Sequence, residues 1–444
     1  MKRFSAIVVC VPLLIFALHP LPLCAQGTLT PPGTPAPMMK TLAQIEARTP
    51  VDATNTPGNG SQQFTITQPG SYYLTGNVTG VNGEYGISIQ TNDVTLDLNG
   101  FQMAGVSGSL YAIVIGTGQN VVIRNGSLRH WSIGVETLNG YCELEHLRVY
   151  DCQSYGFFLT DHCAVRNCSA VSNGYTGMVI GNGCAVADCQ LSFNASNGIT
   201  SSGTCTFKNC AVSRNGATGI AIGNGCALTD CLISSNATGI YAGSDCVISG
   251  CQSGYNQDDG VDLTDNFNIS RSTAKSNGGT GFNLGANGIV NSCTAIGNQS
   301  VEDSGNPGGI VVNNNCIINN CNASGNYTYG IQVMGDNCTI NNCNATGNGD
   351  IGIGVYRNNC KITGNNCSEN YVGIEVQGRG NQIDNNTFGN CGAYGIDDEY
   401  SPVNAGNSIT RNSAPSNSIV GYNGYHDWAP IQTPALATNP WANF

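Results

Sequence analysis

Gly219-Ile-Ala-Ile-Gly-Asn-Gly-Cys-Ala-Leu-Thr-Asp-Cys-Leu-Ile-Ser-Ser-Asn236 is one copy of a repeat of about twenty-one residues. A small residue followed by an apolar run opens each copy. The openings stand at Gly86, Ala112, Gly134, Gly156, Gly177, Gly198, Gly219, Gly239, Gly260, Gly281, Gly309, Gly330, Gly352, Gly373 and Gly395. A fixed period of short apolar runs bounded by Gly and Asn is typical of a solenoid.

Each repeat holds three pairs of apolar residues spaced by two, here Ile220 and Ile222, Cys226 and Leu228, and Cys231 and Ile233. Spacing by two places both members on one face of a strand, so three strands per coil direct their side chains inward. Residues that tolerate positive φ separate the two Cys runs and predict a bend. They are Asn167, Asp188, Asn209, Asp230, Gly250, Asn320 and Asn342, and stacking predicts an Asn ladder there. The Gly that opens each run predicts another tight corner.

Parallel crossovers are nearly always right-handed. The sequence therefore predicts an all-β fold, a right-handed parallel β-helix of about fifteen three-stranded coils and ~70 Å in length. With these repeats, the chain resembles the pectate-lyase-like superfamily and, within it, secreted bacterial β-helix repeat proteins of unknown activity. The resemblance covers residues 64–425, predicted as the β-helix domain, and implies architecture but no reaction.

The ends of the chain have a different composition. Lys2 and Arg3 precede an apolar run, so residues 1–25 are predicted to be an export signal, and no later segment is long and apolar enough to span a membrane. Lipid attachment at Cys24 is the alternative. Residues 26–63 are predicted as a linker followed by a short capping helix, with Met38, Leu42 and Ile45 at helical spacing, and 426–444 as a C-terminal tail.

Most cysteines form columns at the repeat spacing. One column is Cys163, Cys184, Cys205, Cys226 and Cys246, and a second is Cys168, Cys189, Cys210, Cys231 and Cys251. Free Cys packs as a small buried hydrophobe, so we expect mainly reduced columns in the core. Vertical disulfides are the alternative, because stacked Cα atoms lie within bridging distance. The C-x4-C spacing resembles a zinc knuckle only superficially.

The charge balance excludes several classes of partner. Lys and Arg number 16 against 28 Asp and Glu, a formal net charge of −12. Such a surface repels phosphate backbones, so nucleic acid is not expected as a partner. Polyanionic sugars are disfavoured too, unless a divalent cation such as calcium bridges the like charges.

In the superfamily that the chain resembles, substrates lie along one sheet, which corresponds to the runs that open each repeat. The outward, third position of these runs contains no Lys, Arg or His, which counts against the superfamily's lyase reaction. Aromatic residues follow this side: Trp131, Tyr155, Phe158, Tyr175 and Tyr241, and then Tyr327, Tyr329, Tyr371 and Tyr394. Aromatic rings stack on sugar rings, so the first five are the predicted carbohydrate-binding residues. The alternative is that they merely cover coil edges.

An acidic cluster lies on the same side. Asp258, Asp259 and Asp262 are close in sequence, and carboxylates this near share a proton or a cation. They are predicted as a calcium site or as catalytic residues for glycoside hydrolysis, with a solvated turn as the alternative. Residues 259–262 resemble part of the Asn-Thr-Asp-Gly-x-Asp element of polygalacturonases, but that family's second paired Asp, Gly-His-Gly and Arg-Ile-Lys elements are missing. A further cluster, Asp397-Asp398-Glu399, is expected to be a polar end cover.

These features of the sequence lead to three hypotheses for the function. The first is a secreted or surface-attached monomeric rod that associates with a polysaccharide or envelope glycan without catalysis. The second is a polysaccharide lyase or glycoside hydrolase that uses the acidic cluster. The third is a structural rod of the cell envelope.

Overall fold

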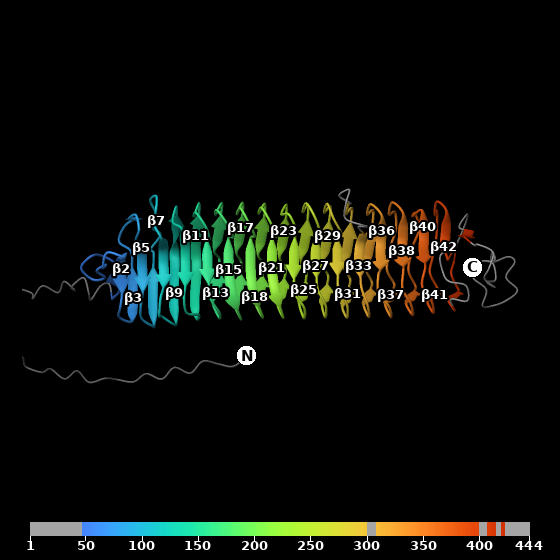
Figure 1. Ribbon diagram of the computed structural model, residues 1–444, viewed down its shortest axis with the longest axis horizontal. Helices are drawn as coiled ribbons and strands as arrows, with labels where there is room; N and C mark the ends of the chain where they lie inside the picture. Colours follow the sequence, from blue (N-terminus) through green and yellow to red (C-terminus); the bar gives the residue numbers. More distant parts are fainter. Residues whose placement is uncertain (1–46, 300–307, 399–405, 414–418, 422–444) are drawn as a thin grey trace, which may run out of the picture. The chain divides into compact units, whose positions relative to one another are not determined.

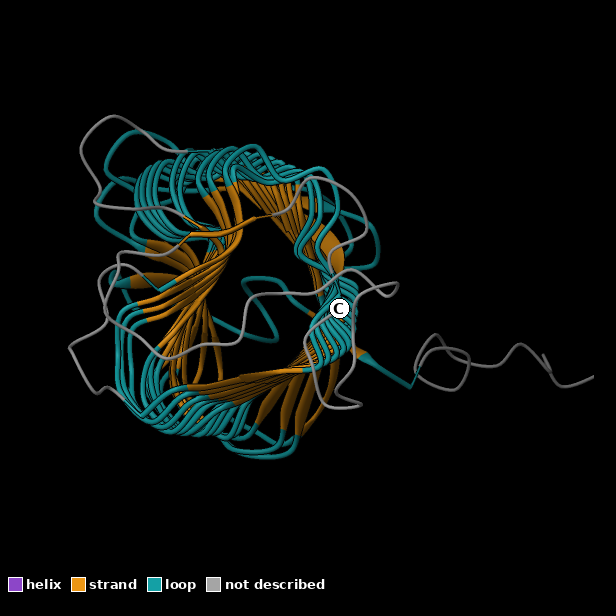
Figure 2. Ribbon diagram, turned by 90° about the vertical axis from the view of Figure 1, so that its right-hand side faces the viewer, coloured by secondary structure: helices purple, strands orange, loops and turns teal. Residues whose placement is uncertain are grey.

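The computed structural model describes residues 47–299, 308–398, 406–413 and 419–421. These residues form strands and turns and contain no helix. The predicted capping helix, export signal and C-terminal tail lie outside the described residues. From Arg48 onwards the chain is one compact unit, in which about sixteen turns stack as parallel coils (Figure 1). The predicted parallel β-helix is confirmed, and Figure 2 shows the stack from its end.

The strands that begin each repeat form one sheet, here called sheet B, in which each strand pairs in parallel with that of the next coil. Its strands are β2 (Gln62–Ile66), β5 (Tyr85–Ile89), β8 (Tyr111–Ile115), β10 (Ile133–Thr137), β12 (Phe157–Leu159), β15 (Met178–Asn182), β18 (Ile199–Gly203), β21 (Ile220–Asn224), β24 (Ile240–Ala242), β27 (Val261–Leu263), β30 (Phe282–Leu284), β33 (Gly308–Val312), β36 (Tyr329–Val333), β38 (Ile351–Val355), β40 (Val372–Val376), β42 (Tyr394–Asp397) and β44 (Ile419–Gly421).

The remaining strands form sheet A, a 27-stranded sheet that bends between the two Cys runs of each repeat. Its strands are β1 (Thr49–Pro50), β3 (Gly70–Tyr73), β4 (Val78–Thr79), β6 (Val94–Asp97), β7 (Gln102–Ala104), β9 (Val121–Arg129), β11 (Cys142–Tyr150), β13 (Ala164–Arg166), β14 (Ser169–Val171), β16 (Ala185–Ala187), β17 (Gln190–Ser192), β19 (Thr206–Lys208), β20 (Ala211–Ser213), β22 (Ala227–Thr229), β23 (Leu232–Ser234), β25 (Val247–Ser249), β26 (Gln252–Gly254), β28 (Asn268–Ser270), β29 (Thr273–Lys275), β31 (Ile289–Asn291), β32 (Thr294–Ile296), β34 (Ile317–Asn319), β35 (Asn322–Ser324), β37 (Thr339–Asn341), β39 (Lys361–Thr363), β41 (Gln382–Asp384) and β43 (Ser408–Thr410).

Most coils therefore have three strands, as predicted. In two coils the sheet A strands merge into one long strand, β9 or β11, and in the coils that begin at β36, β38, β40 and β42 an isolated bridge takes the place of the third strand. The corners of the coils follow one rule. A residue with positive φ turns the chain, and the next residue points its side chain into the core. In one coil the turning residues are His162, Asn167 and Ser172, with φ of 57°, 53° and 56°. The inward residues that follow are Cys163, Cys168 and Asn173, all buried. The bend predicted between the Cys runs is confirmed, and two equivalent corners accompany it.

The turn leaves the backbone N–H of the inward residue without a strand partner, and the next coil supplies one. The Asn215 N–H donates to Asn236 Oδ1 at 3.0 Å, and the Asn215 side-chain amide donates to Leu191 O at 3.3 Å. Repetition of this bond forms a buried ladder through Asn173, Asn194, Asn215, Asn236, Asn256, Asn277, Asn298, Asn326, Asn348 and Asn370. This continuous ladder lies just before sheet B. At the bend where the sequence predicted a ladder, side-chain bonds join some neighbouring coils, such as that from Asn209 Nδ2 to Asp188 Oδ1 at 2.7 Å.

The cysteine columns make the same kind of bond with sulfur. The Cys205 N–H points at Cys226 Sγ at 3.4 Å, and the Cys251 N–H points at Ser272 Oγ at 3.2 Å. All twenty described cysteines are buried and free. The predicted packing of these columns in the core is confirmed. Their thiols also accept hydrogen bonds at corners, which explains why Ser or Asn replaces Cys in some coils.

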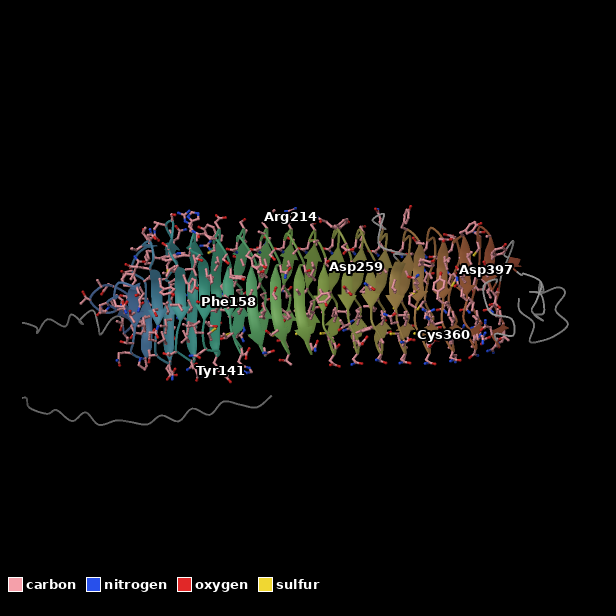
Figure 3. The ribbon with its side chains drawn as sticks, viewed as in Figure 1. Tyr141, Phe158, Arg214, Asp259, Cys360 and Asp397 are labelled. Carbon is pink, nitrogen blue, oxygen red and sulfur yellow. The ribbon has the colours of Figure 1, made fainter. Side chains whose placement is uncertain are left out.

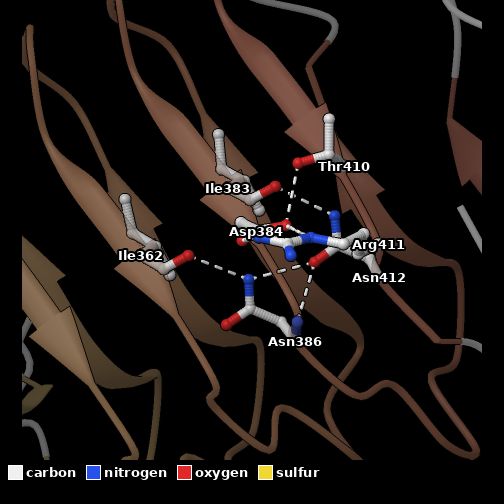
Figure 4. A network of polar contacts seen from close by, with 7 residues as sticks. All are labelled: Ile362, Ile383, Asp384, Asn386, Thr410, Arg411 and Asn412. Carbon is white, nitrogen blue, oxygen red and sulfur yellow. Dashed lines mark hydrogen bonds and ion pairs between the residues drawn. The ribbon is translucent and has the colours of Figure 1, made fainter. Parts of the chain in front are cut away.

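In the last coils one column changes from Cys343 to Asn365, Asn386 and Asn412. Figure 4 shows the last two of these residues. The Asn386 amide donates to Ile362 O at 3.0 Å and to Asn412 Oδ1 at 3.1 Å. On the outer side of the same strands, Asp384 pairs with Arg411 and accepts a hydrogen bond from Thr410 Oγ1 at 2.8 Å. Polar interactions on both the inner and the outer side of this corner thus join adjacent coils.

The Gly that opens each run does not form the tight corner that we predicted. Gly177 and Gly219 have no positive φ. A Cβ at Gly177 would lie 2.6 Å from Asn194 Nδ2, and one at Gly219 would lie 2.7 Å from Asn236 Nδ2. Glycine is therefore required because the Asn ladder passes directly beside the start of sheet B.

Candidate functional site

The outward row of sheet B is the one predicted from the sequence. Pairing of neighbouring strands aligns Ser88, Val114, Glu136, Phe158, Val179, Thr200, Ala221, Tyr241, Asp262, Asn283, Val311, Gln332, Gly354, Glu375 and Asp397. Figure 3 labels three residues on this side of the molecule, which follow one another along the stack: Phe158, Asp259 and Asp397. None of these fifteen described positions carries a cationic side chain.

Three of the predicted aromatic residues form a compact surface cluster. The ring centre of Tyr155 lies 5.1 Å from that of Phe158 and 5.3 Å from that of Tyr175. Tyr175 is 52% exposed, and Tyr241 is 46% exposed on β24, four strands further along. At the spacing of parallel strands, Phe158 and Tyr241 stand ~19 Å apart. The intervening row positions are Val179, Thr200 and Ala221, all small.

The placement of Trp131 in this aromatic row is wrong. Its side chain is fully buried, and its indole N–H donates to Met103 O at 3.1 Å. Trp131 follows the positive-φ residue His130, so it occupies the inner corner where later coils have Asn. Of the four later tyrosines, Tyr327 and Tyr371 are 68% and 58% exposed, whereas Tyr329 is buried at 7%.

The acidic cluster is partly brought together. A Cβ at Gly279 would lie 2.5 Å from Asp259 Oδ1 and 2.7 Å from Asp258 Oδ1, so both carboxylates converge over this glycine. Asp259 also accepts hydrogen bonds from the Thr280 N–H at 2.6 Å and from Asn283 Nδ2 at 3.1 Å. Burial, reinforced by the charges of Asp258 and Asp262, raises the pKa of Asp259 to about 6. Burial likewise raises the pKa of Asp262.

Asp259 is suited to proton transfer. A carboxyl group with a pKa near neutrality can both donate and accept a proton. Within the described ranges, no group of three or more His, Cys, Asp or Glu side chains is arranged to hold a metal ion. The calcium site at Asp258, Asp259 and Asp262 stays a prediction.

Sequence reasoning missed a second polar cluster on sheet B, which we call the tyrosine–carboxylate cluster: Gln332, Tyr329, Tyr356, Glu375 and Asp397. The hydroxyl groups of Tyr356 and Tyr329 lie 2.9 Å apart, and Tyr356 donates to Glu375 Oε2 at 3.4 Å. Glu375 and Asp397 are 9% and 7% exposed on paired strands. Burial raises the pKa of Glu375 and of both phenols. Asp397, which was predicted both in the outward row and as part of a polar end cover, continues the outward row.

The sequence carried one signal for this cluster. Gly354 is the single glycine of the outward row, where the other described positions bear side chains. A Cβ there would lie 3.0 Å from the Tyr356 ring and 3.3 Å from that of Tyr329. The missing side chain therefore makes room for Tyr356, which folds back over sheet B from the end of β38.

Two shallow pockets lie elsewhere, on the outer side of sheet A. One of about 510 Å³ is lined by Gln102, Ser127, Arg148, Tyr150, Asp151, Ser169, Val171 and Ser172. The other, of about 350 Å³, is lined by Gly100, Asn125, Gly126, His146, Arg148 and Asn167. Neither contains a residue predicted to bind carbohydrate.

The family model that describes a right-handed β-helix region matches residues 64–204, 181–317 and 308–426. The chain belongs to this right-handed β-helix family. The predicted right-handed parallel β-helix is thereby confirmed. A comparison with curated proteins found no match. Among the described residues, none forms a helix long and apolar enough to cross a bilayer.

Solved structures of the same fold are only distantly similar. The A-module of a mannuronan C-5 epimerase from Azotobacter vinelandii shares 13% identity over 79% of this chain and 92% of that one, with a TM-score of 0.45. A tailspike protein of Escherichia coli bacteriophage HK620, bound to a pentasaccharide, shares 12% over 79% and 71%, with a TM-score of 0.35. Pectate lyase Pel9A shares 17% over 81% and 77%, with a TM-score of 0.26.

Proposed function

We propose that the protein is exported and binds a linear carbohydrate along sheet B without cleaving it. The observation that carries this proposal is the surface cluster of the partly buried Tyr155 and Phe158 with the exposed Tyr175, followed by small side chains and then by Tyr241. Aromatic rings bind the apolar faces of sugar rings. A parallel β-helix presents equivalent side-chain positions at a constant spacing along its length. Such a surface suits a polymer of repeating sugar units.

Polar groups between the two aromatic positions support the same interpretation. Asn197 Nδ2 donates to Thr200 Oγ1 at 3.0 Å, which orients a hydroxyl and an amide beside the row. Both groups keep donor and acceptor capacity for sugar hydroxyls. Val179 and Ala221 leave this stretch free of bulky side chains. A glycan chain can therefore lie flat between the aromatic cluster and Tyr241.

A polysaccharide-binding assay with single variants tests the proposal. We expect retention on at least one insoluble or gel-embedded polysaccharide, and a three- to tenfold loss in Tyr175→Ala or Tyr241→Ala, or roughly 0.5–1.5 kcal/mol per ring. Leu232→Ala is the matched control, because this exposed apolar side chain lies on sheet A. Absence of binding across a broad screen, or equal binding by parent and variants, would contradict the proposal and favour a structural rod.

Hydrolysis of a glycosidic bond is the second candidate, and the raised pKa of Asp259 favours it. A protonated Asp259 would donate to the leaving oxygen, while Asp258 or Asp262 acts as base or nucleophile. New reducing ends formed by the parent and lost in Asp259→Asn would support this candidate. Cleavage that persists in both Asp259→Asn and Asp262→Asn would place the reaction elsewhere.

A further inference from the structure

We infer that a pocket on the outer side of sheet A binds a tetrahedral oxyanion, which a sugar presents as a sulfate or phosphate ester. The pocket has a volume of about 510 Å³ and is lined mainly by β9, β11 and β14. None of its lining residues belongs to sheet B. The inference therefore goes beyond the proposed function and does not depend on it.

Two arginines lie diagonally opposite each other on the outer face of sheet A. Strand pairing aligns Arg148 on β11 with Ser127 on β9. Two residues further along the same face, it aligns Tyr150 with Arg129. From the spacing of the strands and the rise over two residues, the Cα atoms of the two arginines are roughly 8 Å apart. Their long side chains can therefore reach one ligand, and their like charges repel each other unless an anion lies between them.

Among the described residues, no carboxylate pairs with either arginine. Arg148 is exposed, and its side chain forms no ion pair or hydrogen bond with any residue that the structure describes. Arg129 Nε is buried and lacks a hydrogen-bond partner within the same ranges. By contrast, Arg124 on β9 and Arg166 on the neighbouring β13 form ion pairs with carboxylates. Because a buried donor without an acceptor is unfavourable, Arg129 indicates a ligand that accepts from it.

Hydroxyl groups surround Arg148 and add donors that suit an oxyanion. Ser127 and Ser169 are its partners on the two adjacent strands, and neither side-chain hydroxyl has a hydrogen-bond partner in the described part of the chain. The Tyr150 oxygen accepts a hydrogen bond from Gln102 Nε2 at 2.7 Å, so the Tyr150 hydroxyl can donate its own proton to a ligand. A carboxylate offers two oxygens to such donors, whereas an ester oxyanion offers three that point in different directions. Donors on three strands therefore favour the ester.

The remaining walls of the pocket and the charge of the chain indicate the kind of molecule that carries the ester. Tyr150 and Val171 give the pocket an apolar wall, and a tyrosine ring packs well against a sugar ring. Arg148 also lines the neighbouring pocket of about 350 Å³, where a longer ligand can continue beside His146. The formal net charge of −12 repels a dense polyanion, and the exposed Asp151, which also lines the larger pocket, adds to this repulsion. The favoured ligand is therefore a glycan with isolated ester groups.

Titration calorimetry at low ionic strength with glucose 6-phosphate, glucose 6-sulfate and glucuronate tests the inference. We expect the parent to bind the two esters roughly tenfold more tightly than glucuronate, and Arg148→Gln or Arg129→Gln to lose roughly tenfold in affinity for the esters. Lys208→Gln is the matched control, because Lys208 is an exposed cation on β19 of sheet A that does not line the pocket. Asp151→Asn should instead strengthen ester binding by ~two- to threefold, because it removes the carboxylate that lines the pocket and Asn tolerates its φ of 52°. Circular dichroism and melting curves verify the folding of each variant.

The outcomes separate this inference from the proposed function. Absence of ester binding by the parent, or equally tight binding of glucuronate, would overturn the oxyanion site. Equal losses in Lys208→Gln and Arg148→Gln would also overturn it and indicate only general attraction between the protein and anions. Inorganic phosphate bound as tightly as glucose 6-phosphate would support the oxyanion site, with the free anion as its ligand in place of the sugar ester. Tyr175→Ala should leave ester binding unchanged, so failure of the carbohydrate site on sheet B and failure of this site are measured independently.

Discussion

At each corner a residue with positive φ turns the chain, and the side chain of the next residue points inward and accepts a hydrogen bond from the backbone N–H of the equivalent residue in the neighbouring coil; we call this the corner rule. Replacement of Asn236 by Ala tests it directly. Asn236 is fully buried at the middle of the Asn ladder. Its Oδ1 accepts hydrogen bonds from the Asn215 N–H and from Asn215 Nδ2, both at 3.0 Å. Its Nδ2 donates to Val212 O at 3.2 Å and to Asn256 Oδ1 at 3.4 Å. Alanine removes all four bonds.

The expected loss follows from these contacts. The Asn215 N–H would remain buried without an acceptor, which costs about 1–3 kcal/mol. The other three bonds contribute about 0.5–1.5 kcal/mol each when removed, although their partners keep further bonds. We therefore expect Asn236→Ala to lower the free energy of unfolding by ~3–6 kcal/mol. Such a loss is a large fraction of the stability of an ordinary domain.

Denaturant unfolding followed by circular dichroism measures this loss, and hydrogen exchange at the Asn215 N–H locates it. Asn344→Ala is the control, because Asn344 forms an outer, partly exposed ladder with Asn322 at 2.9 Å that water can replace. We expect it to cost less than about 1 kcal/mol. Equal effects of the two substitutions, with Asn215 exchange unchanged, would refute the role assigned to the corner.

Three further predictions follow from the core and the acidic cluster. Cys226→Ala should destabilise more than Cys226→Ser in thermal melting, because Ser keeps an acceptor for the Cys205 N–H; the reverse order would contradict the corner rule. Trp131→Ala should cost ~3–5 kcal/mol of folding stability, whereas an unchanged melting curve would contradict its burial. The pKa of Asp259 is about 6 in the folded protein against an ordinary value of 3.8. Its contribution to the free energy of unfolding is therefore fully present below pH 3.8 and is lost as the pH rises through 6. The Asp259→Asn variant does not undergo this loss, so its stability relative to the parent should be up to ~3 kcal/mol higher at pH 7 than at pH 3.5. Urea titrations that show no such difference would contradict this.

The fold was predictable because the same pattern of inward apolar residues and turn residues recurs in every coil. Spacing by two fixed the inward residues, and the repeat length fixed the partners of Phe158, Tyr241 and Asp262 in the outward row. The error at Trp131 was avoidable. It stands twenty-one residues before Cys152, which in turn precedes Asn173 by the same interval, so its place in the inner column was visible in the repeat.

The tyrosine–carboxylate cluster was not predictable in the same way. Tyr356 lies beyond the end of β38, and the direction in which its side chain folds depends on the empty space above Gly354. The contact between Tyr356 and Glu375 joins residues in different coils through side-chain conformations that no periodicity specifies. The repeat thus determines the scaffold and the row, while irregular substitutions within the row determine its chemistry.

The corner rule makes whole coils interchangeable. Removal of residues 198–218 would join Asn197 to Gly219, and the Asn194 N–H would then face Asn236 Oδ1 as it now faces Asn215 Oδ1. Every remaining turn would still meet a neighbour of the same kind above and below. Evolution can accordingly lengthen or shorten this protein by duplication or loss of single repeats, and so adjust the distance between the aromatic cluster and the tyrosine–carboxylate cluster without redesigning the interior.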